Sequence, residues 1–392
     1  MITITDEKMC CGCGACEAVC PKKCIHMVTG TLGAVFPKVE KNICIQCGAC
    51  EQVCPILNRK ENIPYRQKAF SAVAKDEHIR FSGSSGGMVE VLSRSILAEG
   101  GIVYGAAFDE NLQLRCTSAE TAEELKPLCK SKYLQSDVSQ KYPEIEAMLK
   151  QGRKVLFVST PCQNAALKNY LKKDYPTLLT ADFFCHGVPS QKFFDECLSY
   201  MDEKNHTETF FYEFRTKKKN GTTPHYFTKK FRKNGREISH TGYYFESPFY
   251  AAFQQYVTLR ESCYSCKFSG RERVSDITIG DFHDIDKYMQ GINRFDGVST
   301  VIVNTDKGAQ LLDRVREELS LYDMDIEQLI RDKTIFSGST SCPVHRDSFV
   351  KCYEEKGISG LMKTYLNQKR YLKNRIYYDM PGPIRKLLKK LI

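Results

Sequence analysis

Two short stretches of the sequence carry cysteines at a spacing that could hold iron–sulfur clusters. Residues 9–21 read MCCGCGACEAVCP and residues 44–55 read CIQCGACEQVCP, so each contains C-x2-C-x2-C-x3-C-P. Three cysteines at every third position let one loop hold three corners of a cuboidal cluster, and in bacterial ferredoxins the fourth cysteine serves the other cluster. The repeats therefore predict two [4Fe–4S] clusters, one held by Cys10, Cys13, Cys16 and Cys54 and the other by Cys44, Cys47, Cys50 and Cys20.

Other uses of these cysteines fit the pattern less well. Structural zinc sites usually combine two separated C-x2-C pairs, and the total of nineteen cysteines is odd, which disfavours a disulfide framework. The N-terminus MITITDEKM shows no apolar signal segment, and no run of 18 apolar residues occurs. We therefore expect a protein of the reducing cytoplasm. Cys11 and Cys24 lie outside the pattern and are interpreted as buried packing residues.

Four cysteines farther along the chain could also do chemistry. Cys263 and Cys266 form a third C-x2-C pair, which is half of a metal site, half of a zinc ribbon or two packed thiols. Cys162 and Cys185 each follow a predicted strand, and a thiol at a helix N-terminus ionises more readily. Either could be a nucleophile or a metal ligand. His186 could donate a proton beside Cys185 or serve a structural role.

Three loops occur where a strand gives way to a helix: SGSSGG (82–87), STPCQ (159–163) and FCHGVPS (184–190). In open α/β sheets ligands bind at the carboxyl ends of strands, where helix N-termini offer N–H groups to anions. The first loop does not fit G-x-G-x-x-G, so an ordinary dinucleotide fingerprint is absent. Its small residues allow close approach of a diphosphate or an isoalloxazine ring, or they form a plain turn.

The elements that must position these residues alternate between strands and helices. The pattern predicts strands at 68–76, 102–109, 112–119, 154–160 and 177–187, and helices at 88–100, 139–151, 161–173 and 190–203. Such alternation indicates βαβ units and a largely parallel sheet. The expected fold is α+β and α/β, with a ferredoxin-like dicluster domain (1–58), a larger mixed α/β flavin-binding domain (68–345) and a basic helical tail (351–392).

The stretch 208–241 departs from this alternation. Asn220-Gly221 and Asn234-Gly235 are strong hairpin signals, so we expect one or two antiparallel hairpins there. The stretch is also basic, which suits either a solvated ribbon or an anion-binding flap over a phosphorylated ligand.

Positive charge is concentrated at the C-terminal end. Residues 351–392 hold eleven Lys or Arg and three Asp or Glu, a net +8 of the chain's +10. Because the rest of the chain is nearly neutral, we expect no nucleic-acid partner. One helical face of PIRKLLKKLI (383–392) is apolar and the other basic, which fits docking to an anionic membrane surface or an acidic partner. Packing on its own domain is the alternative.

Five separated motifs in order give the chain a resemblance to the coenzyme F420 hydrogenase/dehydrogenase beta-subunit family. They are SSGGMVEVL (84–92), SKYLQSD (131–137), TPCQNAAL (160–167), CHGVPSQKFF (185–194) and CYSCKFSGRERVSDITIGDF (263–282). An N-terminal dicluster ferredoxin fusion is also typical of the family, so the resemblance spans roughly residues 1–345.

The resemblance implies bound FAD that exchanges electrons with iron–sulfur clusters. The implied flavin contacts are Ser84, Ser85, Gly86, Gly87, Lys132, Tyr133, Gln135, Thr160, Pro161, Cys162 and Gln163. Cys185, Cys263 and Cys266 are implied ligands of a third cluster. Cys162 is its candidate fourth ligand, in conflict with a purely flavin role.

These inferences predict an iron–sulfur flavoprotein oxidoreductase. Electrons would pass between a two-electron carrier at FAD, either reduced deazaflavin F420 or another hydride donor, and one-electron clusters. Cys185 and His186 are the predicted catalytic residues, and a redox partner protein or hydride carrier is the predicted partner. Two alternatives are a terminal reductase of an organic substrate, such as a sugar in polysaccharide metabolism, and a non-catalytic electron-carrier subunit that docks a partner.

Overall fold

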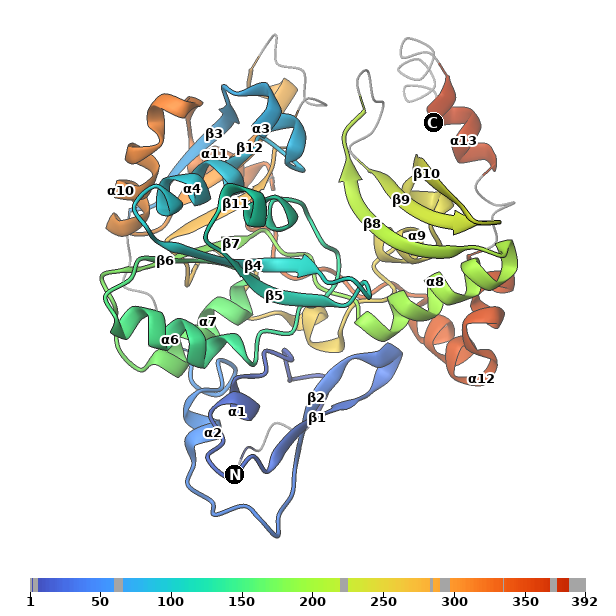
Figure 1. Cartoon of the computed structure of the whole chain (residues 1–392), viewed down its shortest axis with the longest axis horizontal. Coiled ribbons are helices and arrows are strands. Elements are labelled where there is room, and N and C mark those ends of the chain that lie inside the picture. Colours follow the sequence, from blue (N-terminus) through green and yellow to red (C-terminus); the bar gives the residue numbers. More distant parts are fainter. Residues whose placement is uncertain are drawn as a thin grey trace.

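The computed structural model describes residues 2, 6–59, 66–218, 225–282, 285–289, 297–333, 335–366 and 372–380. Within these residues the chain forms an eight-stranded sheet, a three-stranded sheet and a two-stranded ribbon. Figure 1 shows the eight-stranded sheet and its helices in one half of the molecule, the three-stranded sheet beside it, and the N-terminal ribbon below both.

The large sheet has the strand order β13-β3-β12-β11-β7-β6-β4-β5. Its strands are β3 (Lys68–Ala74), β4 (Ile102–Phe108), β5 (Leu114–Ala119), β6 (Val155–Val158), β7 (Leu178–Phe183), β11 (Ile277–Asp281), β12 (Ser299–Val303) and β13 (Leu319–Met324). The four middle strands β4, β6, β7 and β11 are parallel, but β5, β12, β3 and β13 pair antiparallel.

The prediction of a largely parallel sheet is therefore wrong outside the middle of the sheet, and the fold is a mixed α/β fold. The antiparallel pair β4–β5 has a simple cause. Only residues 109–113 connect the two strands, and a parallel pairing needs a crossover of a dozen or more residues. The predicted strands and helices between residues 68 and 205 are otherwise present.

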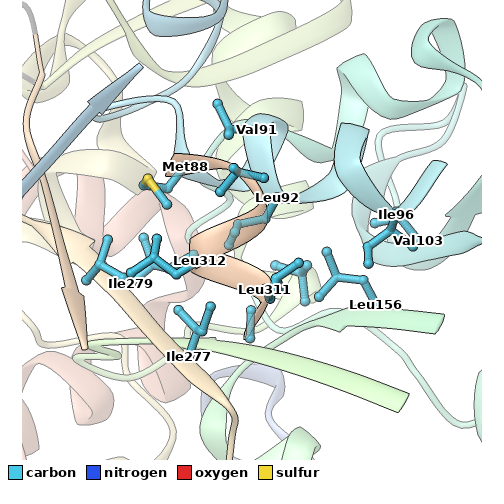
Figure 2. Close-up of a cluster of buried hydrophobic side chains, with 14 of the residues drawn as sticks. Met88, Val91, Leu92, Ile96, Val103, Leu156, Ile277, Ile279, Leu311 and Leu312 are labelled. Carbon is cyan, nitrogen blue, oxygen red and sulfur yellow. The ribbon is translucent and has the colours of Figure 1, made fainter. Parts of the chain in front are cut away.

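Helices cover both faces of the large sheet, which explains its continuous apolar strands. On one face, α4 (Met88–Leu97) and α10 (Asp306–Arg314) pack against Leu156 and Val158 of β6, as Figure 2 shows in part. On the other face, α6 (Lys141–Lys150) and α7 (Pro161–Leu171) pack against Val155 and Phe157. The second core also contains Cys11, Cys13 and Val53, so the N-terminal segment packs onto the α6–α7 layer.

The three-stranded sheet encloses a separate core rich in aromatic residues. Its strands are β8 (Glu208–Thr216), β9 (Tyr226–Lys233) and β10 (Arg236–Tyr243), all antiparallel. Packing against it are α8 (Gln191–Asn205), α9 (Pro248–Gln254) and α12 (Arg346–Thr364). Asn234 and Gly235 both have positive φ, as the predicted tight hairpin turn requires, whereas Asn220-Gly221 lies outside the described residues.

The N-terminal segment repeats one local structure twice. It contains the ribbon β1 (Ile25–Thr29) and β2 (Val35–Val39) and two one-turn helices, α1 (Ala15–Ala18) and α2 (Ala49–Gln52). Each helix follows a left-handed glycine, Gly14 with φ 73° and Gly48 with φ 75°. Glycine adopts this conformation without the steric cost that a side chain brings, so each repeat turns sharply between its second and third cysteines.

The remaining helices are short and lie at the periphery. They are α3 (Glu77–Ser82), α5 (Ala122–Leu125), α11 (Ile326–Arg331) and α13 (Leu372–Asp379). Tyr378 of α13 stacks on Phe245, and Tyr243 donates a hydrogen bond to Asp379. The predicted amphipathic face at 384–392 lies outside the described residues. Among those that are described, no helix is long and apolar enough to cross a membrane.

Candidate functional site

The cysteines of the second repeat line one hollow together with a cysteine of the first. Cys44, Cys47 and Cys50 face Cys20 across this hollow, which is the grouping that the sequence predicted for one cluster. Cys24 also lines it, and its sulfur lies 3.4 Å from that of Cys20. Four thiols from two loops have the donor chemistry that a [4Fe–4S] cluster requires, and Cys24 adds a fifth beside them. We call Cys20, Cys44, Cys47 and Cys50 the second group.

Three cysteines of the first repeat, Cys10, Cys13 and Cys16, are buried, as is Cys54 of the second repeat. Cys10, Cys16 and Cys54 belong to one buried cluster of side chains that also contains Cys50, and Cys13 belongs to the adjoining core. Burial raises the pKa of the Cys16 thiol to about 12, and the nearby sulfurs of Cys10 and Cys54 contribute to this rise. Several thiolates this close together in a buried place would repel one another without a positive charge between them. A metal centre supplies that charge, so the group suits a metal centre. We call Cys10, Cys13, Cys16 and Cys54 the first group.

A third hollow, of about 100 Å³, is lined by five cysteines from four parts of the chain: Cys11, Cys162, Cys185, Cys263 and Cys266. Cys162 is the second residue of α7, Cys185 follows β7, and the C-x2-C pair lies in and after a short 3-10 turn at Glu261–Ser265. Burial raises the pKa of Cys185, and the neighbouring thiols of Cys263 and Cys162 add to this effect. We call Cys162, Cys185, Cys263 and Cys266 the third group; its donor set fits one further cluster.

Cys11 connects the first group to the third. It lines the third hollow beside Cys162, and it packs in one buried core with Cys13 of the first group. Cys11 was predicted to be a packing residue, and it is buried, but the structure also places it directly between two groups of candidate ligands. No feature of the sequence marked this position.

Among the described residues, no three or more His, Cys, Asp or Glu side chains are arranged to hold a single metal ion. The second and third cysteine groups instead line hollows.

A large cavity, of about 510 Å³, lies at the carboxyl ends of β6, β7 and β11. This is where open α/β sheets bind ligands, and the volume is in the range of cofactor sites. Seven of the eleven predicted flavin contacts line it: Ser84, Ser85, Gly87, Lys132, Tyr133, Thr160 and Gln163. Serine hydroxyls, cations and an aromatic ring on its walls have the donor chemistry that FAD needs.

The other four predicted flavin contacts have different surroundings. Pro161 and Cys162 line the third cysteine hollow. Gln135 points to the first repeat, where its amide donates hydrogen bonds to the carbonyls of Cys11 and Gly12. Gly86 packs against the backbone: a Cβ there would lie 2.3 Å from the carbonyl oxygen of Ala72. The glycine at 86 therefore serves close packing of the loop on β3.

Cys185 and His186, the predicted catalytic residues, lie at the mouth of the large cavity. Cys185 lines both this cavity and the third hollow, as do Thr160, Gly187 and Val188. His186 is exposed, and its ring centroid lies 5.9 Å from that of Tyr256. A wall of four residues thus separates the third cysteine group from the predicted flavin cavity.

Arg215 is a cavity residue that the sequence did not reveal. A β-bulge interrupts β8 at this position, and Arg215 has φ 60°, which turns its side chain into the cavity. Its guanidinium forms an ion pair with Asp281 at 2.5 Å and donates hydrogen bonds to Tyr133 and the carbonyl of Ser84. The bulge left no signal in the alternating strand pattern, so the residue could be found only from the fold.

Cationic side chains line the cavity, and three of them form ion pairs. The cations are Lys130, Lys132, Arg215, Arg273 and Lys333; Lys130 pairs with Glu213, Arg215 with Asp281 and Arg273 with Asp182. Burial lowers the pKa of Lys132 to about 7, because desolvation disfavours its ammonium. Tyr133 stacks on Phe253 with ring centroids 4.4 Å apart. The arrangement suits an anionic ligand with a flat ring.

Two family models match the chain, and both describe the beta subunit of coenzyme F420 hydrogenase/dehydrogenase. The model of its N-terminal part matches residues 69–141, and the model of its C-terminal part matches residues 152–328. Together they cover more than half of the 392 residues, and both cysteine repeats precede them. A search of curated proteins gave no match.

One similar solved structure comes from a study of xenon derivatization of the F420-reducing [NiFe] hydrogenase complex from Methanosarcina barkeri. The aligned chain is 19% identical, and the alignment covers 78% of this chain and 94% of that one, with a TM-score of 0.43.

Proposed function

Because this chain belongs to the coenzyme F420 hydrogenase/dehydrogenase beta-subunit family, we propose that it is an iron–sulfur flavoprotein oxidoreductase. In this proposal, electrons pass between a two-electron carrier at FAD and one-electron [4Fe–4S] clusters. The carrier is reduced coenzyme F420 or another hydride donor. The family supports the coarser statement that the chain takes part in redox chemistry, and the cysteine groups support the finer one.

The wall shared by the large cavity and the third hollow is the observation that carries this proposal. Cys185 and Thr160 face both spaces, so a ring in the cavity and a cluster in the hollow would be neighbours. Cys11 lines the third hollow and packs in one core with Cys13 of the first group, and Cys50 of the second group shares a buried cluster with Cys10 and Cys16 of the first. The cysteine groups form one continuous series from the cavity to the N-terminal end.

The residues of the cavity have distinct tasks in this proposal. Ser84, Ser85, Lys132 and Arg215 would hold the anionic parts of FAD, and Tyr133 with Phe253 would provide an aromatic wall. When bound, the flavin supplies the conversion between two-electron and one-electron transfer. Because its side chain faces the hollow, we assign Cys162 to the third cluster as its fourth ligand. His186 remains our candidate proton donor at the cavity mouth.

We propose that a redox partner protein exchanges electrons with the cluster of the second group, because Cys47 is exposed whereas the first group is buried. The short distance to the surface favours electron transfer there.

The proposal is tested by counting cofactors after purification without oxygen. Three clusters predict roughly twelve irons and equivalent sulfide per chain, and two predict roughly eight, together with one flavin. The variant Cys185→Ser should lower the iron content by about four. Cys197→Ser is the matched control, since Cys197 is buried in the separate aromatic core. Zinc without sulfide would refute the assignment.

The electron donor is identified by bleaching of the flavin absorbance. Reduced F420, NADH, reduced ferredoxin and chemical reductants are each added without oxygen. Bleaching by a two-electron donor followed by cluster reduction supports the oxidoreductase. A chain that contains clusters but binds no flavin would instead be an electron-carrier subunit.

A terminal reductase of an organic substrate is the second candidate. The cavity continues beyond the predicted flavin contacts to polar groups of His225, Gln254 and Ser337. These residues come from the three-stranded sheet, from α9 and from the segment before α12, and they leave a place for a polar substrate such as a sugar. Reduction that persists until one substrate is added would favour this function.

A further inference from the structure

Arg260 is a buried arginine that lies between the first and third cysteine groups. Only 3% of its surface is exposed. Its guanidinium donates hydrogen bonds to the carbonyls of Cys10 at 3.2 Å and Val35 at 2.7 Å, and to the side-chain oxygen of Gln135 at 2.7 Å. A Cβ on Gly12 would lie 2.3 Å from its Nη2 atom, so a glycine leaves the space for it.

The main chain of Arg260 belongs to the third hollow. Its N–H donates to the carbonyl of Val188, and its carbonyl accepts from the N–H of Cys263, both at 3.0 Å. Val188 and Cys263 line that hollow. One residue therefore holds the third hollow with its backbone and the first repeat with its side chain.

Within the described residues, Arg260 is the one buried arginine that has no carboxylate partner. The other three are Arg215, Arg273 and Arg346, and they pair with Asp281, Asp182 and Glu261. The hydrogen-bond partners of Arg260 are neutral oxygens. A buried charge is costly unless it is paired, so the protein requires a negative group near this guanidinium.

The cysteines of the first and third groups are the neighbouring residues that become negative when a cluster binds. The guanidinium of Arg260 donates to the carbonyl of Cys10 and lies against Gly12, and its backbone carbonyl accepts from Cys263. A cluster bound by four thiolates has a net negative charge, and that charge increases by one when an electron is added. Arg260 stays protonated throughout, because a guanidinium does not lose its proton in proteins.

We propose that Arg260 is the buried counter-charge of the cluster held by the first group, and that it raises the reduction potential of that cluster. The inference rests on the proposed function. In the reduction step the oxidised cluster gains one electron from the reductant, no proton is taken up, and the fixed guanidinium offsets the added negative charge. Arg260 acts through the cluster and is a positioning residue. The third cluster is affected in the same direction.

The test is a potentiometric titration of the full chain without oxygen, followed by electron paramagnetic resonance. The resonance signal of the first-group cluster is identified as the signal that changes in the variant Cys16→Ser. We expect Arg260→Gln to make electron uptake by this cluster at least tenfold less favourable, a shift of about 59 mV to more negative potential for one electron. Arg260→Lys keeps the charge and should retain most of the potential.

The matched control removes a paired arginine from the same region. Arg346 is also 3% exposed and forms its ion pair with Glu261, next to the third hollow. The double variant Arg346→Gln with Glu261→Gln causes no net change of charge, so the midpoint potential of the first-group cluster should be unchanged. An unchanged midpoint in Arg260→Gln at full iron content, or equal shifts in the Gln and Lys variants, would overturn the inference.

A second pair of variants applies if Arg260→Gln does not retain iron. Gln135→Glu keeps an acceptor for the guanidinium, loses the amide donor to Cys11 and Gly12, and adds a carboxylate that offsets the positive charge. Gln135→Met also loses that donor, together with the acceptor, but adds no charge. We expect the Glu variant to have the more negative midpoint, and equal midpoints would overturn the inference. A wild-type chain that holds no iron and sulfide would instead refute the proposed function.

Discussion

The two cysteine repeats have the same pattern and the same local backbone, but they differ in their surroundings. Cys13 and Cys47 occupy the second position of each pattern, yet Cys13 is buried and Cys47 is exposed. Gly14 and Gly48 have nearly equal φ and begin equivalent helices. The motif therefore determines the ligands and the turn, while the rest of the chain determines what surrounds each cluster.

Side chains from beyond residue 65 donate hydrogen bonds to the backbone of the first repeat. The carbonyls of four successive residues, Cys10 to Cys13, accept them from Arg260, Ser262, Gln135 and Tyr142. Within the part of the chain that the structure describes, no side chain beyond residue 65 donates to residues 44–50. Because burial and hydrogen bonding set the potential of a cluster, two clusters with identical ligand spacing should have different potentials and different stabilities.

Substitution of the two equivalent glycines should give the largest difference. A Cβ at position 14 would lie 2.9 Å from the Cβ of Ser139, whereas a Cβ at position 48 would meet nothing within 4 Å. Both Gly14→Ala and Gly48→Ala force a left-handed alanine, which costs about 1–2 kcal/mol. Gly14→Ala adds an overpacking cost of about 1–3 kcal/mol. Urea midpoints of the cluster-loaded chain measure the difference, and equal midpoints would contradict the unequal surroundings.

Loss of iron should also separate the two groups. On exposure to air or a chelator, we expect the second cluster to be lost at least about tenfold faster, which corresponds to roughly 1.4 kcal/mol of extra protection at the buried first cluster. Iron release and the two resonance signals are followed together. Cys47→Ser should remove the fast phase alone. A single phase for all iron would show that exposure of Cys47 does not control access.

Much of this difference could not be predicted from the sequence, because it depends on contacts between distant residues. The strands and helices between residues 68 and 205 follow from apolar periodicity, and the clusters follow from cysteine spacing. Gln135 was expected at the flavin because it lies in SKYLQSD, but it faces a different space from the residues before it. Tyr133 lines the cavity, whereas Gln135 reaches the first repeat.

The arginines show the same limit. Arg215 enters the cavity through a bulge, and Arg260 lies three residues before Cys263 with nothing in its neighbours to indicate a cluster 250 residues earlier. Periodicity reports which face of an element is buried, not what it is buried against. The family resemblance implied the cysteines of the third group together, but only the fold places Cys11 among them.

Tyr142 provides a smaller test of the support given to the first repeat. Its hydroxyl is buried and donates a hydrogen bond of 2.8 Å to the carbonyl of Cys13. Tyr142→Phe leaves this acceptor without its partner, at a cost of about 1–3 kcal/mol, and should speed iron loss from the first group only. Tyr175→Phe is the control in the same core, because the Tyr175 hydroxyl has no hydrogen-bond partner among the described residues. Equal effects of the two variants would contradict a role for this bond.

The smallest effect should appear in the reactivity of the thiols toward alkylation after the iron is removed. Burial raises the pKa of Cys16 to about 12. Burial also acts to raise the pKa of Cys20, but hydrogen bonds from the backbone and thiol of Cys24 outweigh it and leave this pKa lowered. Since the thiolate is the reactive form, Cys20 should react with iodoacetamide at a lower pH than Cys16.

The two shifts also have opposite consequences for stability. Above about pH 9 the Cys16 thiol of the unfolded chain loses its proton, whereas that of the folded chain keeps it. The contribution of Cys16 to the free energy of unfolding is therefore full below pH 9 and falls as the pH rises toward 12. The contribution of Cys20 to the free energy of unfolding is present above the ordinary pKa of a thiol. It falls as the pH is lowered through the pKa that Cys20 has in the folded chain. Peptide mapping of alkylated thiols between pH 7 and 10 measures the order, with buried Cys197 as the unreactive control. Alkylation of Cys16 before Cys20 would show that the first repeat opens once its iron is gone, and that the cluster itself maintains the contrast between the two repeats.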